Sequence, residues 1–545
     1  MRLCNYCVNL ALNGIMDNQN VNLTLLKLTK RAEQSDPDAL VKTFVDTGML
    51  RALLTSQDHQ VIYGRRGTGK THALIYLAET RRAAGDTCIY VDMRTIGSSI
   101  GLYADDTIPL EERATRLLRD TLTAIHDQLY QAAIENSDRI NLAQVGTQLD
   151  AFLDAATTTM VVGTASDELV TNANAKSERT NSYALGLSGK QPTASVSESN
   201  KAEVALGEQS KVTHAGSKRH RIRFGAITQT LGAICQSVRP KRVWLLLDEW
   251  SAVPMDLQPL LADLVRRCIL PVVGTSVKIA AIEQRSRFLN PGPDADYTGI
   301  ELGADVTVDL NLDDFMVFDH DAEKAVCFFR ALIFNHYRVI AESGTDAIAD
   351  ESDFVKTAFT QITALEEIVR AAEGVPRDAI NVLALSAQKA AEKPIGVNHA
   401  RVAAKTWFER DKEAAVSAKP EAERLLRWIR DEVIAHRRAR AFLLESGTRD
   451  PLIDGLFDAR VLHLLKRNIS AQEQPGIRYD AYKIDYGCYV DLLSTAKGPQ
   501  GLLPASDDDG IAEFVEVPPD DYRAIRRAIL DLSEFKNAQP PCETC

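Results

Sequence analysis

One glycine-rich stretch constrains the fold more than any other feature; it consists of Gly64, Arg65, Arg66, Gly67, Thr68, Gly69, Lys70 and Thr71. A short apolar segment, Gln60 to Tyr63, precedes it, and a helical pattern runs from about Lys70 to Ala84 after it. A second apolar segment, Cys88 to Asp92, comes next. Strand, glycine-rich turn, helix and strand in this order form a βαβ unit, which requires a parallel sheet with right-handed crossovers. The sequence therefore predicts an α/β fold.

The stretch fits the phosphate-binding pattern G-x-x-x-x-G-K-[ST] at every fixed position. Glycines let backbone N–H groups curl around phosphate oxygens without interference from a Cβ atom. The helix that follows directs the positive end of its dipole at the same charge. Lys70 is expected to reach the β- and γ-phosphates of a nucleotide, and Thr71 to bind Mg²⁺ through its hydroxyl. All eight residues are therefore candidate nucleotide-binding residues.

A later apolar strand ends in two carboxylates. Val243 to Leu247 is apolar throughout, and Asp248 and Glu249 follow it directly. We expect Asp248 at the carboxyl end of the strand, beside the phosphate loop, where it would hold Mg²⁺ through water. Glu249 is the candidate for orienting and activating an attacking water. The alternative, a solvated acidic pair at a strand end, is disfavoured by the phosphate loop upstream.

The remaining pattern predicts five parts: a leader at 1–36, an α/β nucleotide-binding domain at 37–312 with a polar insertion at about 155–221, a helical part at 313–395, a mixed part at 396–535 and a tail at 536–545. Within the α/β domain we expect helices at 37–54, 110–134, 224–238 and 257–267, and further strands at 242–248, 270–276 and 305–310. Short alternating pieces at 182–185 and 202–205 could pair as hairpins.

Charge and hydropathy exclude some classes of protein. The chain carries 63 Lys and Arg against 75 Asp and Glu, a formal net charge of −12. This balance argues against coating nucleic acid or an anionic membrane with the whole surface. The longest apolar runs fall far short of the roughly 20 residues that span a bilayer, and the polar amino terminus makes a poor signal peptide. We therefore expect a cytoplasmic protein without a membrane partner.

Two basic segments depart from this acidic average. The first closes the polar insertion and contains Lys211, His214, Lys218, Arg219, His220, Arg221 and Arg223. It is either a solvated loop face or a contact to DNA or to a neighbouring subunit. The second runs from Arg437 to Arg467. Any contact with DNA is expected from these two places.

The nine cysteines include two pairs at opposite ends of the chain, Cys4-x-x-Cys7 and Cys542-x-x-Cys545. The four thiolates could form a zinc site if the termini meet. The alternative is two flexible tails that carry cysteines by chance.

The order of phosphate loop, strand ending in Asp-Glu, further strand, arginines and helical lid resembles the AAA+ ATPases, most closely their origin-recognition or replication-initiator-like clade. The resemblance covers about residues 40–393 and implies binding and hydrolysis of ATP with Mg²⁺. In that family a polar sensor, usually Asn, ends the fourth strand. The matching place here has Thr275 and Ser276, so a hydroxyl would replace the amide that orients the water.

The resemblance also implies roles for three arginines. An arginine finger follows the next helix in the family, and Arg285 or Arg287 would then reach the γ-phosphate of a neighbouring subunit. Arg377 resembles the second sensor, which opens a lid helix and contacts the phosphates. A guanidinium can fork onto two phosphate oxygens, so such a contact is physically reasonable. The alternatives are arginines on a solvated helix end and a plain helix-start arginine.

Initiator-like relatives usually append a winged-helix DNA-binding domain, and residues 396–535 could be similar to one. We expect helices at 423–436 and 458–468, the second as recognition helix, and a wing of strands at 479–484 and 488–492. Candidate phosphate contacts are Arg437, Arg438, Arg440, Arg460, Lys466 and Arg467. The wing also carries Asp480, Asp485 and Asp491, so a domain used for protein contacts is the competing interpretation.

Three functions follow from these features. The leading hypothesis is a Mg²⁺-dependent ATPase switch that assembles as a homo-oligomer or with a neighbouring ATPase subunit and acts on double-stranded DNA. The alternative is a nucleotide-gated signalling or anti-phage defence ATPase whose partners are proteins. The third is nucleotide binding without useful turnover, suggested by the missing sensor Asn. No second catalytic constellation is apparent in the sequence, so we expect a separate effector protein.

Overall fold

The computed structural model describes residues 20–29, 31–96, 103, 105, 107–138, 140–168, 182–186, 193–197, 211–238, 241–293, 296–313, 321–341, 348–436, 439–448, 450–470, 476–490, 502–505, 513–516 and 529–537. The chain forms two compact units, one of Met1–Leu153 with Phe224–Cys545 and one of Asp154–Arg223. The second unit lies close to the bounds expected for the polar insertion.

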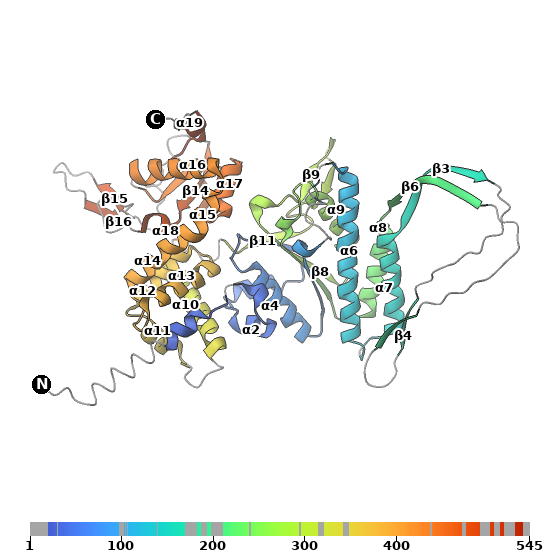
Figure 1. Ribbon diagram of the computed structural model, residues 1–545, viewed down its shortest axis with the longest axis horizontal. Coiled ribbons are helices and arrows are strands. Elements are labelled where there is room, and N and C mark those ends of the chain that lie inside the picture. The colour runs from blue at the N-terminus through green and yellow to red at the C-terminus, as the bar shows by residue number, and fades with distance from the viewer. Residues whose placement is uncertain are drawn as a thin grey trace. The chain divides into compact units, whose positions relative to one another are not determined.

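A five-stranded parallel sheet organises the first unit (Figure 1). Its strands lie in the order β11-β1-β8-β7-β2 and have the bounds β1 Gln60–Tyr63, β2 Thr87–Asp92, β7 Val243–Asp248, β8 Thr275–Ala281 and β11 Thr307–Asn311. Both β7 and β8 are buried along their whole length, as expected for parallel strands covered on both faces. The mixed α/β architecture with a parallel sheet is confirmed.

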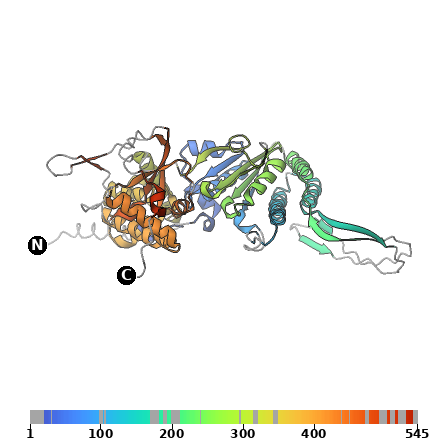
Figure 2. The same ribbon diagram turned by 90° about the horizontal axis from the view of Figure 1, so that it is seen from above.

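Helix α4, Lys70–Ala83, covers one face of this sheet (Figures 1 and 2). Its Leu74 and Leu77 are fully buried in one cluster with Trp244 and Leu246 of β7. The helix expected over 37–54 is two helices, α2 Pro37–Thr43 and α3 Met49–Leu54. The first helix ends because Phe44 has an extended backbone, and Gly48, with a φ of +74°, directly precedes the second helix.

The other long helices of this part are α6 Leu110–Glu135, α7 Leu142–Thr157, α8 Phe224–Ser237 and α9 Gln258–Cys268. The bounds 270–276 expected for a strand are wrong, because β8 begins only at Thr275. Pro271 lacks a backbone N–H to donate, and Gly274 adopts a φ of +98°, so this apolar run forms a turn instead. Thr275 pairs with Val243, the first residue of β7. Thr275 therefore lies at the start of its strand rather than at its end.

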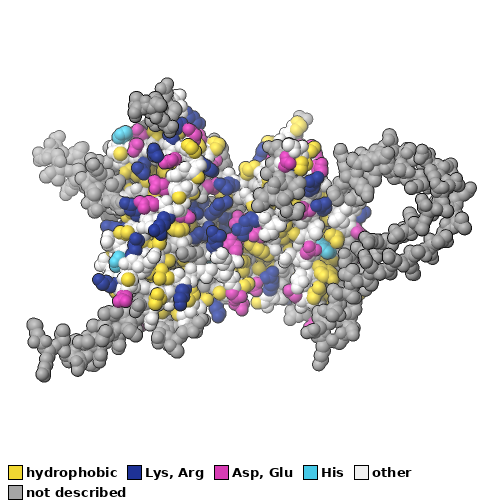
Figure 3. Space-filling view, viewed as in Figure 1, with side chains coloured by type: hydrophobic (Ala, Val, Ile, Leu, Met, Phe, Trp, Pro, Cys, Tyr) yellow, Lys and Arg dark blue, Asp and Glu magenta, His cyan; other side chains and the backbone are white. Residues whose placement is uncertain are grey.

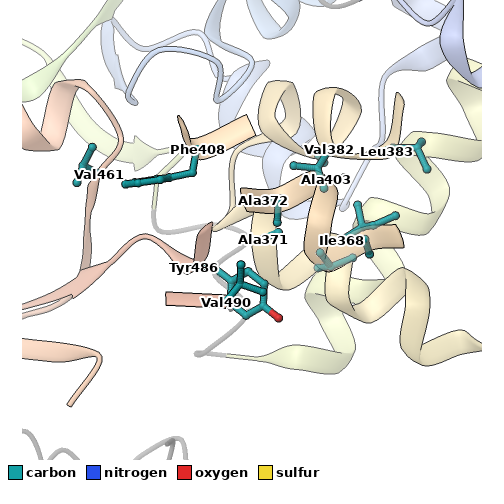
Figure 4. Packing of buried hydrophobic residues seen from close by; sticks show 14 of the residues in the cluster. Ile368, Ala371, Ala372, Val382, Leu383, Ala403, Phe408, Val461, Tyr486 and Val490 are labelled. Atoms are coloured by element: carbon teal, nitrogen blue, oxygen red, sulfur yellow. The ribbon is translucent and has the colours of Figure 1, made fainter. Parts of the chain in front are cut away.

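The helical part follows β11, with the elements α10 Ala322–Ala341, α11 Glu351–Ala358, α12 Ile362–Ala372, α13 Pro376–Ala390, α14 Val397–Trp407, η6 Phe408–Glu413, α15 Ala414–Ser417, α16 Pro420–Ile429 and η7 Arg430–His436. One hydrophobic cluster joins these helices to the carboxyl-terminal residues. Figure 4 shows Ile368 of α12, Val382 of α13 and Ala403 of α14 in the same core as Tyr486 and Val490. The helices and the carboxyl-terminal segment thus share one core.

A three-stranded antiparallel sheet lies in the carboxyl-terminal region, in the order β12-β14-β13. Its elements are β12 Ala441–Glu445, α17 Pro451–Asp458, β13 Leu462–Ser470, β14 Arg478–Ile484, α18 Tyr486–Tyr489 and, further on, α19 Leu532–Asn537. Two expectations are wrong here. The segment 458–468, expected as a recognition helix, is mostly strand β13, and the second wing strand at 488–492 begins inside helix α18.

The physical reasons are local. Leu462, Leu464 and Leu465 suit a helical face as well as a strand, and pairing with β14 selects the strand. Asp485 accepts a hydrogen bond from the backbone N–H of Gly487, which begins α18. The winged helix in the expected form is therefore not confirmed.

The second unit contains antiparallel pairs. Strand β3, Thr159–Glu168, pairs along its whole length with β6, Lys211–His220, and Figure 2 shows the two long strands side by side. Strand β4, Ser182–Gly186, pairs with β5, Thr193–Ser197. The piece expected at 202–205 lies outside the described residues, as do Arg437, Arg438 and both terminal cysteine pairs. Every helix among the described residues is too short or too polar to span a lipid bilayer.

Candidate nucleotide site

The glycine-rich loop connects the end of β1 to the start of α4, as expected. Gly67 and Gly69 have φ angles of +89° and +97°, in the left-handed region that favours glycine. A Cβ atom on Gly64 would lie 2.4 Å from Oγ1 of Thr68, which is too close for any other residue type without rearrangement. The glycines are therefore required by the shape of the loop. Lys70 and Thr71, the last two residues of the motif, are the first two residues of helix α4.

The Lys70 ammonium group lies inside the loop. Its Nζ donates hydrogen bonds to the carbonyl oxygens of Gly64 at 2.7 Å and Arg65 at 3.0 Å. Burial lowers the pKa of Lys70, and the nearby carboxylates of Glu249, Asp313 and Asp248 act in the opposite direction. The loop thus holds a buried positive charge that faces three acidic groups.

Thr71 and Asp248, the two residues expected to bind Mg²⁺, are in direct contact. Thr71 Oγ1, in the first turn of α4, donates to Asp248 Oδ2 at the end of β7 at 2.7 Å, although β8 lies between β1 and β7. Tyr90 of β2 donates its hydroxyl to the same oxygen at 2.7 Å, and the Glu249 N–H donates to Oδ1 at 2.8 Å. Burial and the charge of Asp248 raise the pKa of Tyr90, so its hydroxyl stays a donor. A hydroxyl next to a carboxylate is a donor set that suits Mg²⁺.

Glu249 follows Asp248 in an unusual backbone conformation. Its φ of 53° and ψ of 40° place a residue other than glycine in the left-handed region, a strained conformation that often occurs at functional sites. Its side chain is 23% exposed, and its Oε1 lies 3.9 Å from Arg94, which also pairs with Asp92 at 2.7 Å. The Glu249 carboxylate is thus accessible beside the loop.

Arg65 and Arg66, both in the loop, differ in position. Arg66 is exposed. Arg65 is buried and donates to Asp313 at 2.8 Å and to Nδ1 of His463 at 2.8 Å. Its guanidinium lies 4.8 Å from the ring centre of Phe457. The Arg65 side chain therefore points to the carboxyl-terminal region rather than along the loop.

Arg377 lies against the phosphate loop, as the lid-sensor interpretation expects. It is the second residue of α13, and its backbone N–H donates to the carbonyl of Gly67 at 3.2 Å. A Cβ atom on Gly67 would lie 2.9 Å from Cβ of Arg377. Burial lowers the pKa of the Arg377 guanidinium, and Arg460 adds to this effect. The lid helix and the loop are therefore in van der Waals contact.

Thr275 and Ser276 are far from this site, so their expected role as water-orienting sensors is wrong. The hydroxyl of Thr275 donates to the carbonyl of Val272 at 2.8 Å, and that of Ser276 to Gln57 at 2.7 Å. Both residues begin β8, whereas the phosphate loop follows the end of β1. Parallel strands bring their carboxyl ends to one edge, so the start of β8 lies at the opposite edge.

The two finger candidates, Arg285 and Arg287, follow β8. Arg285 ends the 3₁₀ turn η4 Glu283–Arg285, and its Nε forms an ion pair with Asp458 of α17 within the same chain. Arg287 is exposed, and it donates to Oδ1 of Asn290 at 2.6 Å. Arg287 is thus more accessible to a neighbouring subunit than Arg285.

Two residues of the site were not expected from the sequence, Tyr90 and Asp313. Asp313 accepts hydrogen bonds from both the backbone N–H and the Nε of Arg65. It comes two residues after β11, and the rule that finds Asp248, a carboxylate at a strand's carboxyl end, also finds Asp313. Tyr90 lies inside an apolar strand and carries no comparable signal.

A parallel α/β sheet, a glycine-rich phosphate loop and a Thr-Asp pair beside it are consistent with a P-loop fold. Residues 28–86, which include β1, the loop and α4, match the model of the family described as ORC-CDC6-like. The match supports the origin-recognition/CDC6-like clade of AAA+ proteins. No curated protein matches the chain.

Proposed function

We propose that the chain binds and hydrolyses ATP with Mg²⁺ at the loop and acts as an AAA+ switch. The contact of Thr71 with Asp248 beside the buried Lys70 carries this proposal. Backbone N–H groups of the loop and the start of α4 bind the phosphates, and Lys70 pairs with the β- and γ-phosphate charge. Thr71 and Asp248 hold Mg²⁺, which when bound neutralises charge between phosphate oxygens. Arg377 contacts the phosphates from the lid.

Glu249 is the proposed base for hydrolysis. Its carboxylate accepts a proton from the attacking water, and the backbone geometry after Asp248 directs it to the same edge of the sheet. Arg94 lies close enough to orient this carboxylate. With Thr275 and Ser276 remote, water positioning falls to Glu249 and to groups at the carboxyl end of β8.

Assembly supplies the remaining positive charge. We propose that Arg287 reaches the γ-phosphate held by a neighbouring subunit. Replacing Arg287 by alanine is expected to lower the hydrolysis rate of the assembled chain roughly tenfold, because a charge-assisted hydrogen bond to the phosphate is lost. The rate measured against chain concentration checks this result. Arg285→Ala is the matched variant, and a loss with Arg285→Ala alone would transfer the role to Arg285.

The family match supports DNA as a candidate partner, whereas two of the carboxyl-terminal arginines expected to contact phosphates, Arg460 and Arg467, form ion pairs within the chain. Arg460 is 7% exposed and pairs with Asp378 and Asp411, and Arg467 pairs with Glu283 at 2.5 Å. Figure 3 shows Lys and Arg in the middle of one face with Asp and Glu among them, a mixed surface. Strand β6 and the residues after it are thus the better candidates for a DNA contact.

Titration of the full chain with duplex DNA at low salt separates the two candidate functions. Binding that weakens steeply with salt, and falls about tenfold or more when Lys211, Lys218, Arg219, Arg221 and Arg223 are changed to glutamine, is expected for the DNA-acting switch. Failure to bind any DNA at low salt, with ATP-dependent self-assembly intact, would favour a defence or signalling ATPase with protein partners.

A further inference from the structure

The phosphate loop is tied to the carboxyl-terminal region by one side chain. Arg65 lies between two fixed residues of the loop motif, yet its Nη1 donates to His463 Nδ1 at 2.8 Å and to the Leu462 carbonyl at 3.2 Å. Both acceptors belong to β13. The side chains of Arg65 and His463 are each 3% exposed. This contact is therefore largely shielded from solvent.

The hydrogen bonds fix the state of His463. Arginine only donates, so Nδ1 of His463 is the acceptor, and its Nε2 carries the proton that is donated to Asp485 Oδ2 at 2.9 Å. Burial lowers the pKa of His463 to about 3, with Asp485 opposing and Arg65 adding to the shift. His463 is thus a neutral, oriented link between a loop arginine and a buried carboxylate.

The chain of contacts continues to the lid. Lys412 of η6 lies 2.5 Å from Asp485 and 2.9 Å from Asp378 of α13, and all three side chains are at most 2% exposed. Burial alone would lower the pKa of Lys412, but Asp378 and Asp485 raise it, so the ammonium stays charged. Arg460 completes the group through Asp378 at 3.2 Å. We call Arg65, His463, Asp485, Lys412, Asp378 and Arg460 the buried charge network.

The network meets the phosphate loop at two places. One end is Arg65 itself. At the other end, Asp378 directly follows Arg377, whose backbone N–H donates to Gly67 at 3.2 Å. The loop is therefore held on one side by the carboxyl-terminal sheet and on the other by the start of the lid helix.

We propose that His463 and Asp485 are positioning residues for the phosphate loop, acting through Arg65. This inference rests on the proposed nucleotide binding and adds to it that the carboxyl-terminal region is thermodynamically coupled to the occupied loop. A buried network has few alternative arrangements, because breaking one pair leaves an uncompensated charge. Phosphate oxygens that accept hydrogen bonds from the loop N–H groups shift the Arg65 backbone, and the buried charge network transmits that shift to β13.

A double-mutant cycle on the full chain tests the positioning role. His463 is 3% exposed and cannot reach the nucleotide, yet His463→Leu should weaken Mg·ATP binding about fivefold or more, as should Arg65→Met. The double variant should lose less than the sum of the two single losses, because the hydrogen bond between Arg65 and His463 is removed in both single variants, although Arg65→Met also removes the contact with Asp313. His463→Gln, which can still accept from Arg65 and donate to Asp485, should restore most of the affinity. Additive losses, or unchanged affinity in His463→Leu, overturn the proposal.

Hydrogen exchange with and without Mg·ATP gives a readout that a merely structural role would not move. In the wild type, nucleotide should reduce the exchange rate of the amides of 64–74 and of 462–466 about fivefold or more. In Arg65→Met the slowing should persist at 64–74 and disappear at 462–466, whereas Arg51→Met, at an exposed position outside the loop, should keep both. Slowing at 64–74 alone in the wild type overturns the coupling but not the nucleotide site. No slowing at either segment overturns both.

Discussion

Replacing Lys70 by alanine is expected to weaken Mg·ATP binding about 100-fold, because hydrogen bonds between an ammonium group and phosphate oxygens are among the stronger ones in proteins. Lys70 is buried in the centre of the loop, so other cations of the chain cannot easily take its place. Isothermal titration calorimetry of the full-length variant measures the loss.

Lys389→Ala is the matched control, since Lys389 is an exposed lysine of α13. The control should bind as the wild type does, and thermal unfolding without nucleotide should show that the Lys70 variant is folded. A folded Lys70→Ala chain with wild-type affinity would contradict the assignment of the loop as the nucleotide site.

Glu249→Gln is expected to slow ATP hydrolysis about 100- to 1,000-fold while it leaves Mg·ATP affinity within a few fold. Glutamine keeps the size of the side chain and cannot accept the proton of the attacking water at neutral pH. Phosphate release under saturating ATP gives the rate, and calorimetry gives the affinity.

Glu301→Gln, at an exposed position, controls for the loss of one negative charge. Equal hydrolysis rates for Glu249→Gln and the wild type would remove Glu249 from the catalytic role. Loss of affinity without loss of rate would instead indicate that Glu249 helps to hold the metal.

The core of the site could be predicted because its signals are local. The glycines, Lys70 and Thr71 lie in one short stretch between a strand and a helix, and Asp248 is delivered by a run of apolar residues. The carboxyl-end rule for parallel strands then places the two segments together, and the contact of Thr71 with Asp248 agrees with it.

The predictions that are wrong concern short apolar segments whose pattern fits two kinds of local structure. The run before Thr275 is apolar, but Pro271 and Gly274 turn the chain and move the strand to later residues. Residues 462–465 suit a helix as well as a strand, and only pairing with β14 decides. The register of a sheet is tertiary information that such windows do not contain.

The contact of Arg65 with His463 could not be predicted for another reason. The two residues are 398 positions apart, and neither stands in a pattern that indicates the other. In the motif Arg65 occupies a variable position, so its sequence context assigns it to the phosphate loop alone. The Arg65 side chain instead contacts the carboxyl-terminal region, and only the packed structure reveals this contact.

The most direct test of the nucleotide site is a calorimetric titration of the full wild-type chain with ATP in the presence of Mg²⁺. The geometry of Lys70, Thr71 and Asp248 predicts saturable binding at one site per chain, weakened when a chelator removes the metal. No binding heat up to millimolar ATP, together with no displacement of a fluorescent ATP analogue, would contradict the proposed function.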